Sequence, residues 1–282
     1  MKIALVQPFW SDQEDPQYPN DSWDKEALIR HLHGISEDVD LVVFPECYPW
    51  CGDEDGQPSE GMTLDFMREQ MAEVSRNTKK TFIAGGLVRE GNDTRNVVML
   101  ASPGSKCSDE HVYRKRLPWE DENITPGEIE QDALFKFGSD QQYAVIPLIC
   151  ADVFGAATRE TPQQHEDHQA IVDRARDRMR CRPGAPIIVC AYAAGPRGRR
   201  WNQRLDELVT PFQDQKEQTL DALFCNFAGH HTIQRNIFGR GGSRLVSSRD
   251  TSRRGPRNPG VFIYDLGPEV PTAVLKRNQS FP

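Results

Sequence analysis

The chain has 282 residues, with 34 basic against 42 acidic side chains, a formal net charge of −8 and 37% hydrophobic residues. This charge disfavours general binding to nucleic acids or to an anionic membrane surface, so neither partner is expected. No apolar run approaches the roughly 20 residues that a membrane-spanning helix needs, and the length is sufficient to bury a sizeable hydrophobic core.

Seven cysteines are spread along the chain in an odd number and without the spacing of a disulfide framework. This usage favours a reducing environment, and we expect a cytoplasmic protein. The first apolar run, residues 2–7, is short and meets Pro8 at once. It therefore predicts a first strand and not a signal peptide.

Hydrophobic periodicity predicts strands that alternate with helices. We predict helices over 22–33, 62–77, 169–180 and 201–222, and strands over 2–7, 40–44, 81–87, 95–102, 111–114, 134–137, 143–150, 186–192, 223–227, 232–238, 245–246 and 261–264. Pro211 is expected to interrupt the last helix, and the polar segment 156–168 is expected to be a loop. Because helices separate strands in both halves while other strands follow one another directly, we expect a single α/β domain over 1–282, with one mixed sheet or two sheets.

Cys150 ends the most apolar strand of the chain, which runs almost without interruption from Val145 to Ile149. Such a run is typical of a strand covered on both faces, and the end of such a strand is where open α/β sheets place their ligands. A thiol at this position is a candidate nucleophile. The alternative is a core cysteine, because unpaired cysteine is among the most buried residue types.

Two other predicted strands end at charged residues that suit the chemistry of a thiol. Glu46 follows the strand 40–44 and Pro45, and an acid beside an apolar core can have the raised pKa of a general base. Lys115 follows the strand 111–114, where its ammonium could hold the oxygen of a tetrahedral intermediate. Taken alone, Glu46 could be a solvated loop carboxylate and Lys115 a surface charge.

The order acid, lysine, thiol resembles the nitrilase, or carbon-nitrogen hydrolase, superfamily along nearly the whole chain. The segments that carry the resemblance are the opening strand 2–7, Val-Val-Phe-Pro-Glu at 42–46, Tyr-Arg-Lys-Arg-Leu at 113–117 with Glu120 and Thr-Pro-Gly at 125–127, Ile-Cys-Ala-Asp at 149–152, and Asn226, Gly229 and 238–243 late in the chain. The chain departs from the family at Ala151, where tyrosine or tryptophan is common, and in the polar stretch Thr158 to Asp167.

The resemblance implies an α-β-β-α four-layer sandwich with two mixed sheets, assembled as a homodimer or larger homo-oligomer. Cys150 would be the nucleophile, Glu46 the general base, and Lys115 the group that stabilises the oxyanion with help from the backbone N–H of Ala151. Glu120 would match the second glutamate of the family, which positions the lysine and the substrate. The chemistry implied needs no metal and no organic cofactor.

Aromatic residues follow several of the predicted strand ends. Tyr48, Trp119 and Tyr192 could line a substrate pocket above Cys150, and the alternative is ordinary packing at the rim of the sheets. Histidine and cysteine positions complete no convincing metal site.

The sequence therefore predicts a cysteine-dependent hydrolase that cleaves a non-peptide carbon-nitrogen bond of a small amide or N-carbamoyl compound through a thioester. Three alternatives remain on the same fold: a nitrilase, an N-acyltransferase in which an amine replaces water, and a non-catalytic binding protein. The first two use the same three residues for the first attack.

Overall fold

The computed structural model describes residues 1–9, 25–50, 57–119, 122–130, 133–155, 161–182, 184–191, 199–209, 221–228, 231–233, 236–238, 243–247, 259–266 and 272–274. The helices in these ranges are α1 (Lys25–His33), α2 (Leu64–Thr78), α3 (Ala151–Phe154), α4 (Pro162–Cys181) and α5 (Arg199–Val209). The strands are β1 (Lys2–Gln7), β2 (Leu41–Val43), β3 (Pro49–Trp50), β4 (Phe82–Glu90), β5 (Asp93–Ala101), β6 (Val112–Arg114), β7 (Phe135–Phe137), β8 (Tyr143–Ile149), β9 (Ile187–Cys190), β10 (Asp221–Cys225), β11 (His231–Ile233), β12 (Asn236–Phe238), β13 (Arg244–Ser247), β14 (Gly260–Asp265) and β15 (Thr272–Val274).

The strands form two large mixed sheets and one small hairpin. The first sheet has the order β15-β14-β1-β2-β4-β5-β6, and β3 pairs with β4 beside this path. The second sheet has the order β13-β10-β9-β8-β7, and β11 pairs with β12. In each sheet a parallel centre is flanked by antiparallel strands: β1, β2 and β4 are parallel in the first, and β8, β9 and β10 in the second.

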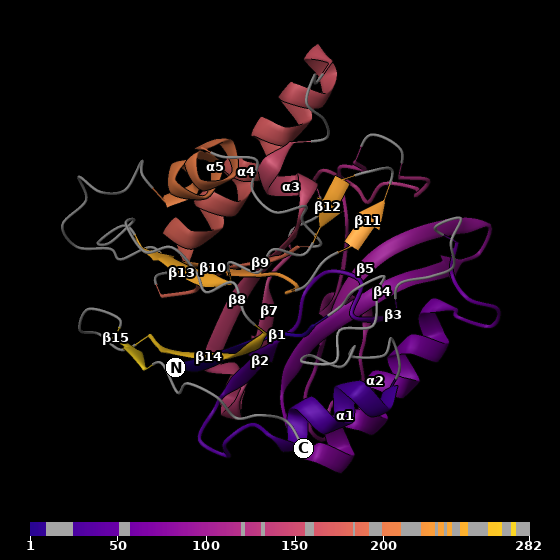
Figure 1. Ribbon diagram of the computed structural model, residues 1–282, viewed down its shortest axis with the longest axis vertical. Coiled ribbons are helices and arrows are strands. Elements are labelled where there is room, and N and C mark those ends of the chain that lie inside the picture. The colour runs from indigo at the N-terminus through magenta and orange to yellow at the C-terminus, as the bar shows by residue number, and fades with distance from the viewer. Residues whose placement is uncertain are drawn as a thin grey trace.

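The side chains of β1 show how the layers are stacked. Ile3 and Leu5 belong to the core that the two sheets share, whereas Ala4 and Val6 belong to the core under α1 and α2. Because successive side chains of a strand point to opposite faces, the first sheet is buried on both faces. Figure 1 shows α1 and α2 below the first sheet and α4 and α5 above the second. The predicted α-β-β-α sandwich with two mixed sheets is confirmed.

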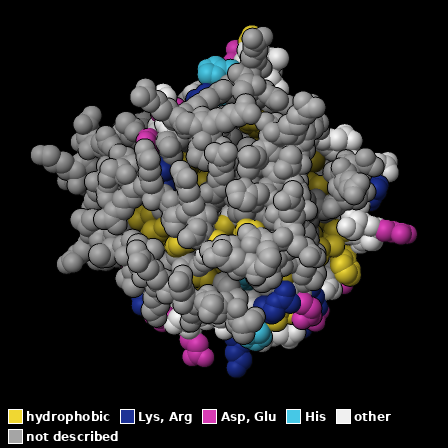
Figure 2. All heavy atoms as spheres, viewed as in Figure 1, with side chains coloured by type: hydrophobic (Ala, Val, Ile, Leu, Met, Phe, Trp, Pro, Cys, Tyr) yellow, Lys and Arg dark blue, Asp and Glu magenta, His cyan; other side chains and the backbone are white. Residues whose placement is uncertain are grey.

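The outer helices are amphipathic. In α2, Met67, Met71 and Val74 are fully buried, at the spacing of one helix face. Figure 2 shows charged side chains of both signs at the lower edge of the molecule, where Figure 1 places α1 and α2. Within the described ranges, every helix is too short or too polar to cross a bilayer.

The predicted strands agree with the structure within a few residues, with three exceptions. The segment 232–238 is a hairpin of β11 and β12 and not one strand, and β3 and β15 were not predicted. The predicted helix 22–33 is confirmed from Lys25 onward, and α5 lies at the start of the predicted helix 201–222, whose residues 210–220 lie outside the described ranges.

The loop predicted over 156–168 is wrong from Pro162 onward, because α4 begins there. Thr161 caps this helix: its side chain accepts a hydrogen bond from the Gln164 backbone N–H, and the Gln164 side chain accepts one from the Thr161 N–H. Pro162 suits the first helical position, which needs no backbone donor. The first turns of α4 are polar, so apolar periodicity does not reveal them. The Thr-Pro-Gln-Gln sequence is nevertheless a capping box.

Removing this cap is expected to destabilise the protein slightly. Thr161→Ala should lower the free energy of unfolding by about 1 kcal/mol, because the Gln164 N–H loses its acceptor at an exposed helix end. Urea denaturation of the wild type and the variant would measure the difference. Thr161→Ser keeps the hydroxyl and should retain most of the stability; an equal loss in both variants would contradict a capping role.

Candidate active site

Glu46, Lys115 and Cys150 come from both sheets and meet in the interior. Glu46 lies just beyond β2, Lys115 follows β6 directly, and Cys150 follows β8. Their exposed fractions are 2%, 2% and 5%. Because β2 and β6 belong to the first sheet and β8 to the second, the packing of the two sheets brings these residues together.

Lys115 joins two carboxylates. Its Nζ lies 2.7 Å from Oε1 of Glu46 and 2.6 Å from Oε2 of Glu122. Burial by itself would lower the pKa of Lys115, but the charges of Glu122 and Glu46 outweigh it and raise the pKa well above its ordinary value. Lys115 is therefore favoured as an ammonium beside these two acids.

Asn96, on β5, connects the same two carboxylates. Its Nδ2 donates to Oε1 of Glu46 at 2.8 Å and to Oε1 of Glu122 at 2.9 Å. Its backbone carbonyl accepts from the N–H of Lys115 at 2.8 Å. Asn96, Glu46, Lys115 and Glu122 thus form a closed ring of hydrogen bonds and ion pairs.

Cys150 occupies a strained turn between β8 and α3. Its backbone has φ 36° and ψ −94°, a conformation that side-chain-bearing residues rarely adopt. Its N–H donates to the carbonyl of Cys190, and its carbonyl accepts from the N–H groups of Val153 and Phe154. The chain therefore turns sharply at the thiol, which lies between the end of a strand and the amino end of a helix.

The thiol is held in its protonated form. Burial raises the pKa of Cys150 well above its ordinary value, and the negative charge of Glu46 raises it further, while Lys115 acts in the opposite direction. At neutral pH a thiol in this setting does not ionise by itself. A nucleophilic role for such a thiol would require a base, and Glu46 is the carboxylate whose charge acts on it most strongly.

Asp152 connects the turn at Cys150 to the residues that follow Lys115. Its Oδ1 accepts from the N–H groups of Arg116 and Leu117, at 3.0 and 2.9 Å, and its Oδ2 accepts from Tyr113 Oη at 2.7 Å and the N–H of Ile149 at 3.1 Å. Burial raises the pKa of this fully buried carboxyl, while these donors act to lower it. One side chain thus fixes the residue before Cys150 and the two residues after Lys115.

Asp152→Ala is expected to lower the free energy of unfolding by about 3 kcal/mol, because four buried donors lose their acceptor together. Chemical denaturation would measure the loss. Tyr113→Phe removes one of the four bonds and should destabilise by about 1 kcal/mol. Equal losses in the two variants would show that the backbone donors do not depend on Asp152.

The second glutamate that contacts Lys115 is Glu122, and the sequence did not single it out. Glu122 Oε2 also accepts from the N–H of Trp119 at 2.9 Å. Glu120, predicted for this position, lies outside the described ranges. Glu120, Asp121 and Glu122 follow Trp119 directly in the sequence, and of these three acids the structure describes Glu122.

The other predicted substrate-binding residues differ in position. Trp119 packs at the margin of the core that contains Cys150, and Ala151 opens α3 directly after the thiol. Tyr48 is fully buried in the other core, stacked on Phe44 with ring centroids 5.1 Å apart. Tyr192 lies outside the described ranges. A pocket-lining role for these residues stays a prediction.

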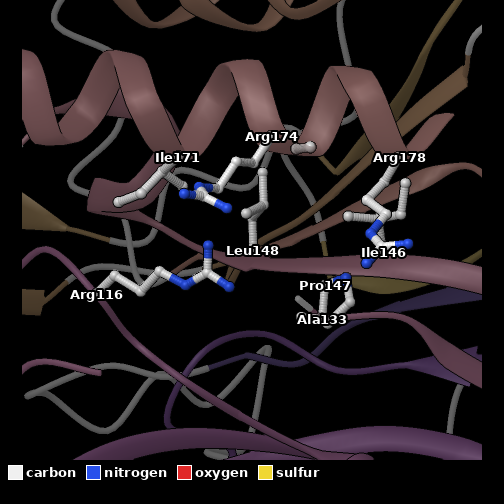
Figure 3. A pocket seen from close by; sticks show the side chains of 9 residues that line it. Arg116, Ala133, Ile146, Pro147, Leu148, Ile171, Arg174 and Arg178 are labelled. Atoms are coloured by element: carbon white, nitrogen blue, oxygen red, sulfur yellow. The ribbon is translucent and has the colours of Figure 1, made fainter. Parts of the chain in front are cut away.

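A separate cleft lies between α4 and β8. Its described lining includes Arg116, Arg174 and Arg178 together with the apolar residues Ile146 and Leu148. Figure 3 shows the side chains of Arg116 and Arg174 extending into the space between the helix and the strand. None of Glu46, Lys115 and Cys150 is among the described lining residues. In the same part of the chain, no group of three or more histidine, cysteine or acidic side chains is arranged to hold a metal ion.

No protein-family model and no curated protein matches the sequence. The fold, in contrast, has solved relatives. An amidase from Nesterenkonia sp. AN1 superposes with a TM-score of 0.64 at 20% sequence identity, covering 95% of this chain and 93% of the amidase. A mutant of that amidase carries acrylamide, added to its active-site cysteine, and superposes with a TM-score of 0.65 at 19% identity over the same shares.

A second mutant of the Nesterenkonia enzyme is described as an amidase from the nitrilase superfamily. It superposes with a TM-score of 0.64 at 18% identity, covering 93% of this chain and 89% of the other. The resemblance that the sequence motifs predicted is confirmed at the level of the fold. This chain has the fold of a nitrilase-superfamily amidase.

Proposed function

We propose that this protein is a cysteine-dependent hydrolase of small amides or N-carbamoyl compounds. The observation that carries the proposal is the buried cluster of Glu46, Lys115 and Glu122 beside a protonated thiol in a strained turn. The cluster combines a base, a fixed positive charge and a nucleophile, which are the groups that acyl transfer requires. The amidase fold of the solved relatives supports the same class of reaction.

The first half-reaction forms a thioester. Glu46 takes the proton of Cys150 as Sγ attacks the carbonyl carbon, and the carbonyl oxygen becomes negative. The Lys115 ammonium and the N–H of Ala151, at the amino end of α3, stabilise that oxygen. When the intermediate collapses, the carbon-nitrogen bond breaks and the leaving nitrogen takes the proton from Glu46.

The second half-reaction releases the acid. Glu46, again ionised, removes a proton from water, whose oxygen attacks the thioester carbon. The carbon-sulfur bond then breaks, and the thiolate regains its proton from Glu46. Because Lys115 keeps its charge in both halves, the same group stabilises both intermediates.

Mass spectrometry tests the proposal directly. The protein is incubated with a pooled panel of small amides, N-carbamoyl amino acids and nitriles, quenched rapidly in acid, and measured intact and as peptides. We expect an acyl adduct on Cys150, absent in Cys150→Ala, and its mass identifies the acyl group. Release of ammonia or an amine from an amide substrate would support hydrolysis of amides, and release of ammonia from nitriles alone would support a nitrilase.

Adding a candidate amine separates hydrolysis from acyl transfer. Faster turnover and a new amide would indicate an acyltransferase. An unchanged rate and an acid product are expected for the proposed hydrolase. A panel that yields no adduct and no loss of substrate, together with an unreactive Cys150, would contradict the proposal.

A further inference from the structure

Asn96 donates hydrogen bonds to two carboxylates at once. Its single Nδ2 bonds to Oε1 of Glu46 and to Oε1 of Glu122, at 2.8 and 2.9 Å. Asn96 is 1% exposed and its bond to Glu46 is buried, whereas its bond to Glu122 is part-buried because 21% of the Glu122 side chain is exposed. Both acceptors also contact Lys115, so the amide and the ammonium together hold the two acids.

The orientation of the Asn96 amide follows from charge. If the amide were rotated by half a turn, its oxygen would face two carboxylates, and both bonds would become repulsions. In the present orientation, Oδ1 is buried without a hydrogen-bond partner among the described residues. A side chain with a purely structural role would be expected to satisfy both ends of its amide. In Asn96 the hydrogen bonds are made by the Nδ2 donors, which face the two carboxylates.

The bonds divide the two oxygens of Glu46. Oε1 receives both Lys115 Nζ and Asn96 Nδ2. A carboxylate oxygen that already accepts two strong donors is a poor proton acceptor, and the Cys150 thiol also interacts with the Glu46 carboxylate. Glu122 is held differently: Oε2 accepts from Lys115 and from the N–H of Trp119, and Oε1 accepts from Asn96. Both oxygens of Glu122 are thus occupied.

We propose that Asn96 is a positioning residue that keeps Glu46 ionised and holds its carboxylate in place beside Cys150, while it also binds Glu122 so that Glu46 is the base. This inference rests on the proposed function and deepens it. Asn96 touches neither the thiol nor the reacting carbon; it acts through the two acids. Its backbone carbonyl, which holds the N–H of Lys115, extends the same role to the lysine.

Alkylation of Cys150 by iodoacetamide tests this without a known substrate. The rate at Cys150, followed by peptide mass spectrometry from about pH 4 to pH 8, should fall on the acidic side as the base becomes protonated. Amide N–H donors favour the ionised form of a carboxylate. Removing them raises the pKa of the base, so the acidic fall of the profile should move to higher pH, by about one pH unit.

Two variants remove the donors in different ways. Asn96→Leu keeps the approximate size without a donor, and Asn96→Asp keeps the shape but adds a third carboxylate, so its shift should be the larger. Ser75→Ala is the matched control, because Ser75 is also fully buried and its hydroxyl donates to the Lys80 carbonyl, on the helix side of the first sheet. This control should lose stability without moving the profile.

The outcomes separate this inference from the proposed function. A shifted profile in either Asn96 variant, with an unshifted one in Ser75→Ala, supports the role. An unshifted profile in a folded Asn96 variant overturns it and leaves the proposed function intact. A wild-type profile with no acidic fall, unchanged by Glu46→Gln, overturns both.

If neither Asn96 variant folds, nitrogen-edited NMR of the wild-type protein still tests the role of Asn96. One side-chain amide pair should have both protons protected from exchange and should shift with the acidic fall of the alkylation profile. The absence of such a pair overturns the role.

Discussion

Cys150→Ala is expected to lower turnover of any amide substrate by at least about 10⁴-fold, because the proposed thioester forms on the Cys150 sulfur. Alanine removes only the sulfur from a site whose backbone is held by Asp152, Cys190 and α3, so the variant should fold. Steady-state kinetics and thermal unfolding of the same preparations would measure both effects.

The matched control for this variant is Cys107→Ala. Cys107 is also buried, and burial raises the pKa of its thiol to about 11, but it lies after β5 with its sulfur donating to the Leu100 carbonyl. Its removal should leave turnover unchanged. At neutral pH, iodoacetamide should modify Cys150 and not Cys107, because only Cys150 has a carboxylate base beside it. Residual activity of Cys150→Ala within about tenfold of the wild type would contradict the nucleophile assignment.

Glu46→Gln is expected to reduce turnover by at least about 10²-fold while the fold is retained. A glutamine oxygen can still accept from Lys115 and Asn96, so the ring of contacts can close, but the amide cannot take the thiol proton. The comparison of turnover in the two proteins therefore isolates the base.

In Glu46→Gln the thiol of Cys150 should ionise more easily, although turnover falls. The charge of Glu46 raises the pKa of Cys150, so its removal should lower that pKa. Direct ionisation of the thiol, seen as the alkaline rise of iodoacetamide alkylation, should begin at a lower pH in Glu46→Gln. A variant with a more acidic thiol and a wild-type rate would show that the base lies elsewhere.

Glu122→Gln provides the control for charge alone. It also removes one negative charge beside Lys115, but both Glu122 oxygens already accept hydrogen bonds. We expect a smaller loss of turnover than in Glu46→Gln. The rate of Cys150 alkylation by iodoacetamide should still fall on the acidic side of its pH profile. Equal behaviour of the two variants would mean that the glutamates share the role of base.

Local signals in the sequence determined much of the fold. Unbroken apolar runs such as 145–149 predicted strands buried on both faces, and the alternation of strands and helices predicted an α/β protein. The motifs around Glu46, Lys115 and Cys150 predicted the four-layer arrangement, which the structure confirms. These features are readable because each depends on a short stretch of chain, whose hydrophobic period or chemistry is local. Even the start of α4 had such a signal, in the capping box at Thr161.

The tertiary structure decided which polar groups meet. Asn96 lies in the middle of a strand, 50 residues from Glu46 and 26 from Glu122, and nothing near it in the chain indicates that its amide joins two acids. Glu122 is one of three consecutive acids after Trp119 in the sequence, and Asp152 is a single carboxylate whose four donors come from β6, β8 and the residues after Lys115. Contacts of this kind depend on the register of strands and on sheet packing, which bring together residues far apart in sequence. The meeting of Cys150, Glu46 and Lys115 was therefore predictable from strand ends and from the resemblance that their motifs carry, whereas the contacts of Asn96, Glu122 and Asp152 were not.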